Sequence, residues 1–130
     1  MNDKLVRKDL IYPALSYQLV GILFEVYNQL GPGYHEKYYQ RAIAAEFKKC
    51  NIVFNEQVFT PLQFKNQRIG RQYLDFLVED KIALEIKKGN RFSKRNIEQI
   101  FNYLKTAKLK LGIIANFGSK DLKFKRVINL

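Results

Sequence analysis

The sequence predicts an α/β protein with a mixed β-sheet flanked by helices: two N-terminal helices, a β-meander, a third helix and two strands. Three observations carry this prediction. Apolar residues recur every three or four positions before residue 50, β-rich segments fill 52–88, and a helical pattern followed by two strand-like runs ends the chain. At 130 residues and 47% apolar content, we expect one domain over 1–130, with 1–8 as a flexible N-terminal arm.

The first predicted helix has Asp9 as its N-cap and ends at Leu30. Its apolar residues are spaced by three and four along one face, and Gly31-Pro32-Gly33 stops the helix and turns the chain. The members of that face are Ile11, Leu15, Leu19, Ile22, Leu23, Val26 and Leu30.

The second predicted helix runs from about His35 to Cys50 and carries Glu36 on the same face as its apolar residues. The helix dipole favours an acid in the first turn, whereas an acid on an inward face needs a cation or a donor. Position alone leaves both explanations open. Because Cys50 is the one cysteine, the chain cannot form an internal disulfide framework, and we expect a cytoplasmic protein. Cys50 itself is expected to be a small core residue.

The remaining elements follow from β-formers, breakers and caps. Ser93 is placed to cap the third helix, whose core stripe leaves Gln99 and Tyr103 to face solvent or a site. Pro61 is expected to break a strand, and Asn66-Gln67 to turn the chain. The predicted segments are strands at 52–59, 62–65, 68–72, 74–78, 82–86, 111–117 and, at an edge, 124–130, and a helix at 94–107.

Three charged residues interrupt the apolar runs of the central hairpin at 74–86. Asp75 lies in its first strand, and Glu85 and Lys87 lie in or just after its second. Side chains alternate across a strand, and opposed residues share a face. A three-residue loop, Glu79-Asp80-Lys81, pairs Asp75 with either Glu85 or Lys87. We therefore expect two carboxylates and an ammonium group on one surface.

Two neighbouring carboxylates repel each other unless a cation lies between them. Mg²⁺ prefers oxygen ligands, keeps several waters and binds phosphates at its remaining positions. A lysine beside it can deprotonate an attacking water or neutralise charge on a phosphorane-like transition state. The alternative is that Asp75, Glu85 and Lys87 form an ordinary cross-strand ion pair on a surface hairpin.

The net charge of +11 comes almost entirely from the C-terminal part of the chain. Residues 1–80 carry ten Lys/Arg and nine Asp/Glu, whereas residues 81–130 carry thirteen and three. This asymmetry favours a polyanion-binding face, the alternative being lysines that decorate exposed edges. No apolar run is long enough to span a bilayer, so no membrane partner is expected. The basic residues nearest the hairpin are Lys88, Arg91, Lys94 and Arg95.

The sequence resembles the GxxExxY protein family. The signature is Gly33-Tyr34-His35-Glu36-Lys37-Tyr38-Tyr39, preceded by Leu30-Gly31-Pro32. The likeness continues, from about Leu15 over nearly the whole chain, through Asp75, Glu85-Ile86-Lys87, Gln99 with Tyr103-Leu104, and Asn116-Phe117-Gly118. The family is similar to a compact branch of the PD-(D/E)xK nuclease superfamily, which includes many restriction and repair endonucleases.

The resemblance implies a restriction-endonuclease-like core and a site of five residues. Asp75 and Glu85 would be metal ligands, Lys87 the catalytic lysine, Glu36 an additional acid near the metal, and Gln99 a site residue on the following helix. One departure is visible: relatives often have an arginine where Tyr73 stands, and here Arg71 lies two positions earlier. This departure bears on substrate positioning, not on the metal ligands.

The residues and the resemblance together predict a Mg²⁺-dependent nuclease, with Mn²⁺ as a substitute. Its partner is a nucleic acid, DNA more than RNA, and a homodimer is compatible with the chain. A weakly active or inactive nucleic-acid-binding module is the alternative, and an interaction partner in a DNA-processing complex is a third interpretation. The complete acid–acid–lysine set favours the enzyme, because a pure binder gains nothing from two acids facing a phosphate.

Overall fold

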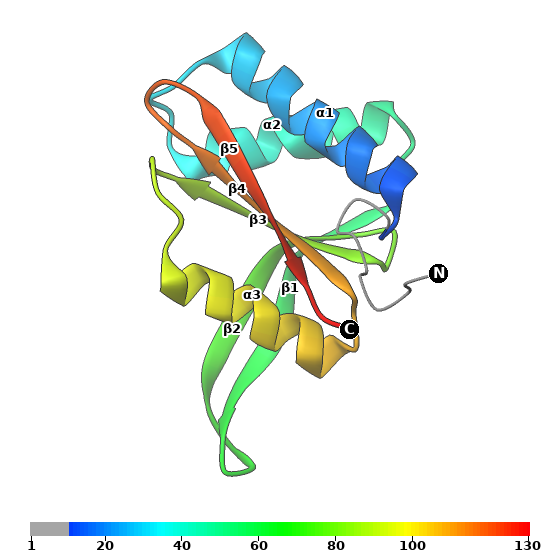
Figure 1. Ribbon diagram of the computed structural model, residues 1–130, viewed down its shortest axis with the longest axis vertical. Coiled ribbons are helices and arrows are strands. Elements are labelled where there is room, and N and C mark those ends of the chain that lie inside the picture. The colour runs from blue at the N-terminus through cyan, green and yellow to red at the C-terminus, as the bar shows by residue number, and fades with distance from the viewer. Residues whose placement is uncertain (1–10) are drawn as a thin grey trace, which may run out of the picture.

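The computed structural model describes residues 11–130 as a five-stranded sheet with helices on both faces (Figure 1). The order of elements agrees with the sequence prediction. The elements are α1 (Pro13–Leu30), α2 (Glu36–Lys49), β1 (Phe54–Phe64), β2 (Gln67–Val78), β3 (Ile82–Lys88), α3 (Lys94–Ala107), β4 (Leu111–Phe117) and β5 (Leu122–Ile128). No helix in this part of the chain combines the length and hydrophobicity needed to cross a bilayer.

The sheet is mixed, with the strands in the order β1-β2-β3-β4-β5. β1, β2 and β3 form an antiparallel meander, β3 and β4 are parallel, and β4 and β5 are antiparallel. The parallel pair needs a crossover, which α3 supplies. The inner strand β4 is buried along its whole length, whereas β5 lies at an edge, as predicted.

Two apolar cores lie on opposite faces of the sheet. α1 and α2 cover the face that carries Ile82, Leu84 and Ile86, and Leu19, Ile43 and Phe47 are among the helix residues packed there. α3 covers the other face, where Ile100, Tyr103 and Leu104 meet residues of the sheet that include Ala83 and Ile114. Because neighbours along a strand face opposite ways, odd-numbered Glu85 and Lys87 lie on the α3 face.

The beginning of α1 differs from the prediction. The helix begins at Pro13, a residue favoured at the first helical position because it has no N–H to satisfy. Tyr12 is the N-cap, in a left-handed conformation, instead of the predicted Asp9. Asp9 and the expected arm at 1–8 lie outside the described residues. The other end of α1 is as predicted, because Gly31, with φ +76°, donates its N–H to the carbonyl of Tyr27.

The predicted break at Pro61 is wrong, because β1 runs without interruption through Pro61. β1 is an edge strand, so a residue without an N–H is tolerated there. The turn falls one residue earlier than predicted, on Lys65 and Asn66, both with positive φ as in a type I′ hairpin. β1 and β2 therefore form one long hairpin, which extends past the rest of the sheet (Figure 1).

Two burial predictions also change. Cys50 is exposed as the C-cap of α2 and is not a core residue. Tyr103, expected off the core stripe of α3, is buried in the core between this helix and the sheet. The Ser93 cap is confirmed, since its hydroxyl accepts a hydrogen bond from the N–H of Asn96 at 3.3 Å.

Candidate functional site

The site is built where β2 and β3 part from each other. The two strands pair from Val78 and Ile82 at the loop up to Phe76 and Leu84, and side chains replace the ladder beyond that point. Asp75 donates its backbone N–H to Glu85 Oε1 at 2.8 Å. The N–H of Ile86 donates to Asp75 Oδ2, also at 2.8 Å. Of the two partners that the sequence allowed for Asp75, the structure selects Glu85.

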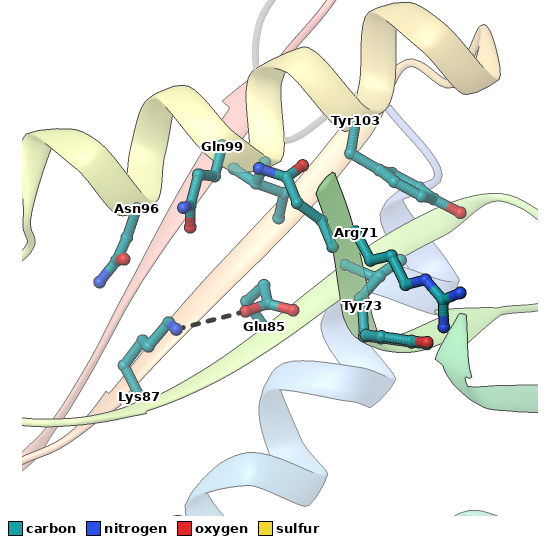
Figure 2. A pocket seen from close by; sticks show the side chains of 10 residues that line it. Arg71, Tyr73, Glu85, Lys87, Asn96, Gln99 and Tyr103 are labelled. Carbon is teal, nitrogen blue, oxygen red and sulfur yellow. Dashed lines mark ion pairs between the residues drawn. The ribbon is translucent and has the colours of Figure 1, made fainter. Parts of the chain in front are cut away.

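Each carboxylate is thus fixed by one oxygen and presents its other oxygen to a side chain. Asp75 Oδ1 accepts a bond of 3.4 Å from the Gln57 amide. Glu85 Oε2 lies 3.6 Å from Lys87 Nζ, the ion pair drawn in Figure 2. The predicted grouping of Asp75, Glu85 and Lys87 on one surface is therefore present, with Gln57 as an addition.

The burial of two adjacent acids shifts their proton affinities. Burial, and then the negative charge of Asp75, raise the pKa of Glu85 to about 7, although the N–H of Asp75 and the ammonium of Lys87 oppose the shift. Burial likewise raises the pKa of Asp75, against the lowering effect of hydrogen bonds from Ile86 and Gln57. The pair resists carrying two negative charges, and a cation would relieve this repulsion.

Glu36 reaches the end of β3 from the N-terminus of α2. Its Oε2 accepts a hydrogen bond of 2.9 Å from the backbone N–H of Lys88. The negative charge of Glu36 is the last of the causes that shift the pKa of Asp75. The carboxylate therefore has a donor that accounts for its position in the first turn, while its field extends to the acid pair.

The tyrosine of the same motif closes the turn before α2. Tyr39 is buried, stacks on Phe117 with ring centroids 4.2 Å apart, and donates its hydroxyl to the carbonyl of Gly31 at 2.6 Å. His35 serves as the N-cap of α2, where its Nδ1 accepts the N–H of Lys37. Both residues position the helix that delivers Glu36 to β3.

A cavity of about 260 Å³ opens beside the acid pair, between β2, β3 and α3. Figure 2 shows Gln99 and Asn96 on α3, with Lys87 and Glu85 below them on β3. Gln99, which the sequence left between solvent and the site, lines this cavity. The other side chains that line it are Arg71, Gln72, Tyr73, Leu74, Ile100 and Tyr103.

The four basic residues expected to bind nucleic acid lie around the exit of β3 and the start of α3. Lys88 ends β3, and its Nζ lies 3.5 Å from the carbonyl oxygen of Gly33. Arg91 is in the loop that follows, and Lys94 and Arg95 open α3. All four are exposed, which leaves their charges accessible to a polyanion.

The donor set fits a hard divalent cation. Two carboxylates with one anchored and one presented oxygen each are the ligands that Mg²⁺ and Mn²⁺ accept, with water and phosphate completing the shell. Within residues 11–130, no group of three or more His, Cys, Asp or Glu side chains is already arranged to hold a metal. Asp75 and Glu85 would be the ligands, and Glu36 stays a predicted addition.

Two residues near the acids, Gln57 and Asn96, were not predicted from the sequence as part of the site. Asn96 is three residues before Gln99, a helical spacing that places the two on one face and was available as a signal. Gln57 adopts a φ of +49° within β1, and the pairing of β1 with β2 skips from Glu56 to Val58 at this position. That irregularity arises from tertiary structure, and no local motif of the sequence announces it.

Comparison with known proteins identifies the family. The model of the PD-(D/E)XK nuclease superfamily matches residues 13–127, and the chain belongs to this superfamily. The fold is also similar to the crystal structure of SSO0001, with a TM-score of 0.53 and 13% sequence identity over 93% of this chain. The chain spans 57% of the length of that chain, and the likeness concerns the fold. No curated protein matches the sequence.

Proposed function

We propose that the protein is a Mg²⁺-dependent nuclease that hydrolyses phosphodiester bonds, in DNA rather than RNA, with Mn²⁺ as a substitute metal. The observation that supports this most is the parting of β2 and β3, where Asp75 and Glu85 each present to side chains, Lys87 among them, one oxygen that no backbone N–H holds. Membership of the superfamily supports the reaction class. We identify Asp75, Glu85, Lys87, Glu36 and Gln99 as the site residues.

A divalent cation held by Asp75 and Glu85 would supply Lewis acidity at the scissile phosphate. The side chains of the protein position the substrate and polarise the reacting groups. Lys87, 30% exposed at its side chain, lies next to the acids and can act on the attacking water or on the developing negative charge. Gln99 and Asn96 face the same cavity and offer amide donors for phosphate oxygens. The reaction joins a water oxygen to phosphorus and releases the leaving oxygen, which takes up a proton.

The proposal predicts different defects for Lys87→Ala and Asp75→Asn. Loss of the ammonium should leave nucleic-acid and metal binding nearly intact and lower the cleavage rate roughly 10²- to 10³-fold. Asp75→Asn should lose metal affinity and cleavage together. Lys49→Ala, at an exposed lysine in the last turn of α2, removes the same charge outside the cavity and should cleave like the wild type.

The assay uses labelled single- and double-stranded DNA and RNA with Mg²⁺ and, separately, with Mn²⁺. Cleavage by the wild type and loss of it in Lys87→Ala would support the nuclease. A second candidate, a nucleic-acid-binding module, is favoured by one observation: Asp75 and Glu85 bond the backbones of the parting strands and thus have a structural role. Tight binding without cleavage in either metal would select the module.

A further inference from the structure

The outer part of the β1–β2 hairpin, residues 59–73, carries an unusual combination of side chains; we call it the arm. Several of its apolar side chains are exposed, among them Phe59 (43%), Phe64 (59%) and Tyr73 (49%). All charged residues between positions 57 and 74 are cations: Lys65, Arg68 and Arg71. Exposed rings together with unopposed cations are typical of a surface that binds a polyanion with aromatic faces.

Strand register places four of these groups, Phe59, Tyr73, Arg71 and Arg68, on one face of the arm. Phe59 and Tyr73 are directly opposed, with ring centroids 5.8 Å apart. Arg71 lies two residues before Tyr73 on the same strand and therefore shares its face. The register shift between Leu62 and Gln63 then brings Arg68 to this face, where its guanidinium lies 4.8 Å from the centroid of the Phe59 ring. The face thus carries two opposed rings, followed by two cations toward the tip of the arm.

Two residues of this face reach the candidate site. Arg71 and Tyr73 line the same cavity as Glu85 and Lys87, as Figure 2 shows. Two residues beyond Tyr73, β2 reaches Asp75, whose carboxylate accepts the N–H of Ile86, the neighbour of Glu85. A chain lying along the arm would therefore arrive at the acid pair.

We propose that the arm binds an unpaired DNA strand and leads it to Asp75 and Glu85. Bases stack on the rings of Phe59 and Tyr73, while Arg68 and Arg71 neutralise phosphates. In a duplex the base faces are stacked on one another, and the rings would find no partner. The choice of DNA over RNA for this strand rests on the proposed function.

The charges of the arm disfavour a second copy of the chain as its occupant. A two-fold interface apposes the same patch on both subunits, so Lys65, Arg68 and Arg71 of one arm would face the same group of cations on the other. Like charges brought together in this way are destabilising. A phosphodiester strand offers the opposite charge.

The test measures fluorescence anisotropy of a labelled strand of about 20 nucleotides and of its blunt duplex, in EDTA so that cleavage does not interfere. The variants are Phe59→Leu, which keeps an apolar side chain but removes the ring, and Arg68→Gln. Tyr17→Leu is the matched control, because it removes an 82% exposed ring from α1. Circular dichroism checks that each variant is folded.

We expect the wild type to bind the single strand more tightly than the duplex. Phe59→Leu should weaken single-strand binding roughly five- to a hundredfold, the effect of losing one stacked base, and Tyr17→Leu should not change it. Equal affinity of wild type and Phe59→Leu, or tighter binding of the duplex, would overturn the proposal. Arg68→Gln is an independent test if Phe59→Leu does not fold, since unchanged binding by that variant also refutes the proposed role of the arm.

Two further comparisons separate this proposal from the proposed function. An RNA strand of the same sequence that binds more tightly than DNA would overturn the choice of DNA. If the variants of the arm lose binding but the wild type cleaves nothing in Mg²⁺ or Mn²⁺, strand binding by the arm is supported and the nuclease is refuted. If the wild type cleaves while these variants bind normally, the nuclease is supported and the role of the arm is refuted.

Discussion

At the scale of single residues, Glu85 makes the stability of the metal-free protein depend on pH. The pKa of Glu85 is about 7 in the folded protein and near 4.5 in the unfolded chain. Between pH 4.5 and pH 7 the folded state therefore keeps a proton on Glu85 that the unfolded state has lost. The free energy of unfolding should therefore fall as pH rises from 4.5 to 7, by roughly 2–3 kcal/mol.

Urea unfolding in EDTA at a series of pH values measures this effect. Glu85→Gln keeps an oxygen that can accept the N–H of Asp75 but cannot ionise. We expect the variant to be the more stable protein at pH 8 and to lose most of the slope. A wild type whose stability rises between pH 5 and 7 would contradict a raised pKa at Glu85.

A single substitution can also test the role of Glu36. If it contributes to a metal site, Glu36→Gln should weaken Mn²⁺ binding roughly tenfold or more in calorimetric titration, whereas an amide can still accept the N–H of Lys88. Glu25→Gln, an exposed acid on α1, is the control for a general loss of charge. Equal Mn²⁺ affinities in Glu36→Gln and the wild type would mean that Glu36 is not part of a metal site. Its role would then be to accept the N–H of Lys88 at the end of β3 and to interact with the dipole of α2.

At the scale of elements, the close approach of α3 to β4 depends on Gly112. A Cβ at this position would lie 2.8 Å from Ile100 Cδ1 and 3.1 Å from its Cγ1, closer than carbon atoms pack. Gly112→Ala should lower the free energy of unfolding by about 1–3 kcal/mol through overpacking. Gly21→Ala is the matched control, because no atom lies within 4 Å of a Cβ there and the exposed helical site gains about 0.5–1 kcal/mol from alanine.

Denaturant unfolding of both alanine variants tests this packing. The two substitutions should move the midpoint in opposite directions. Cleavage provides a second readout, because α3 also carries Gln99 into the cavity. A Gly112→Ala protein as stable as Gly21→Ala would mean that α3 can move away from β4 without cost.

The order of the elements could be predicted from the sequence because each rests on local chemistry. The period of α1, the Ser93 cap of α3 and the apolar run of β4 all predict their elements correctly. One failure has a tertiary cause and another a local one. From the local sequence, Pro61 predicts a break in the strand. The residue is tolerated within β1 because this strand lies at the edge of the sheet. Asp9 has the chemistry of an N-cap, but Pro13 makes a better first residue.

At the scale of the whole molecule, the charge asymmetry predicts a strong salt dependence. If four to six cations each neutralise one phosphate of a single strand, the logarithm of the binding constant should fall with that of salt concentration at a slope of about −3 to −4. Anisotropy titrations at several salt concentrations measure the slope, and the double change Lys94→Gln with Arg95→Gln should make it shallower. A binding constant that is flat with salt would contradict a polyanion-binding face.

The candidate site could be predicted only as far as alternation and loop length allow. The three-residue loop places Asp75 and Glu85 on one face, and the structure has them there. The sequence contains no local signal for the parting of β2 and β3, the conformation of Gln57 or the approach of Arg71 to the cavity. These depend on twist and on irregular strand pairing, which no local segment of the sequence specifies.

The anchoring of Asp75 and Glu85 to the backbone of the opposite strand affects how sequence motifs of this kind are interpreted. Under the proposed function, a descendant that no longer cleaved anything would still need both acids, because they hold together a place where the sheet has no ladder. The ammonium of Lys87 pairs with a side chain instead of the backbone. Loss of the lysine is therefore the change by which an inactive descendant of this fold can be recognised, and retention of the acids alone says little about catalysis.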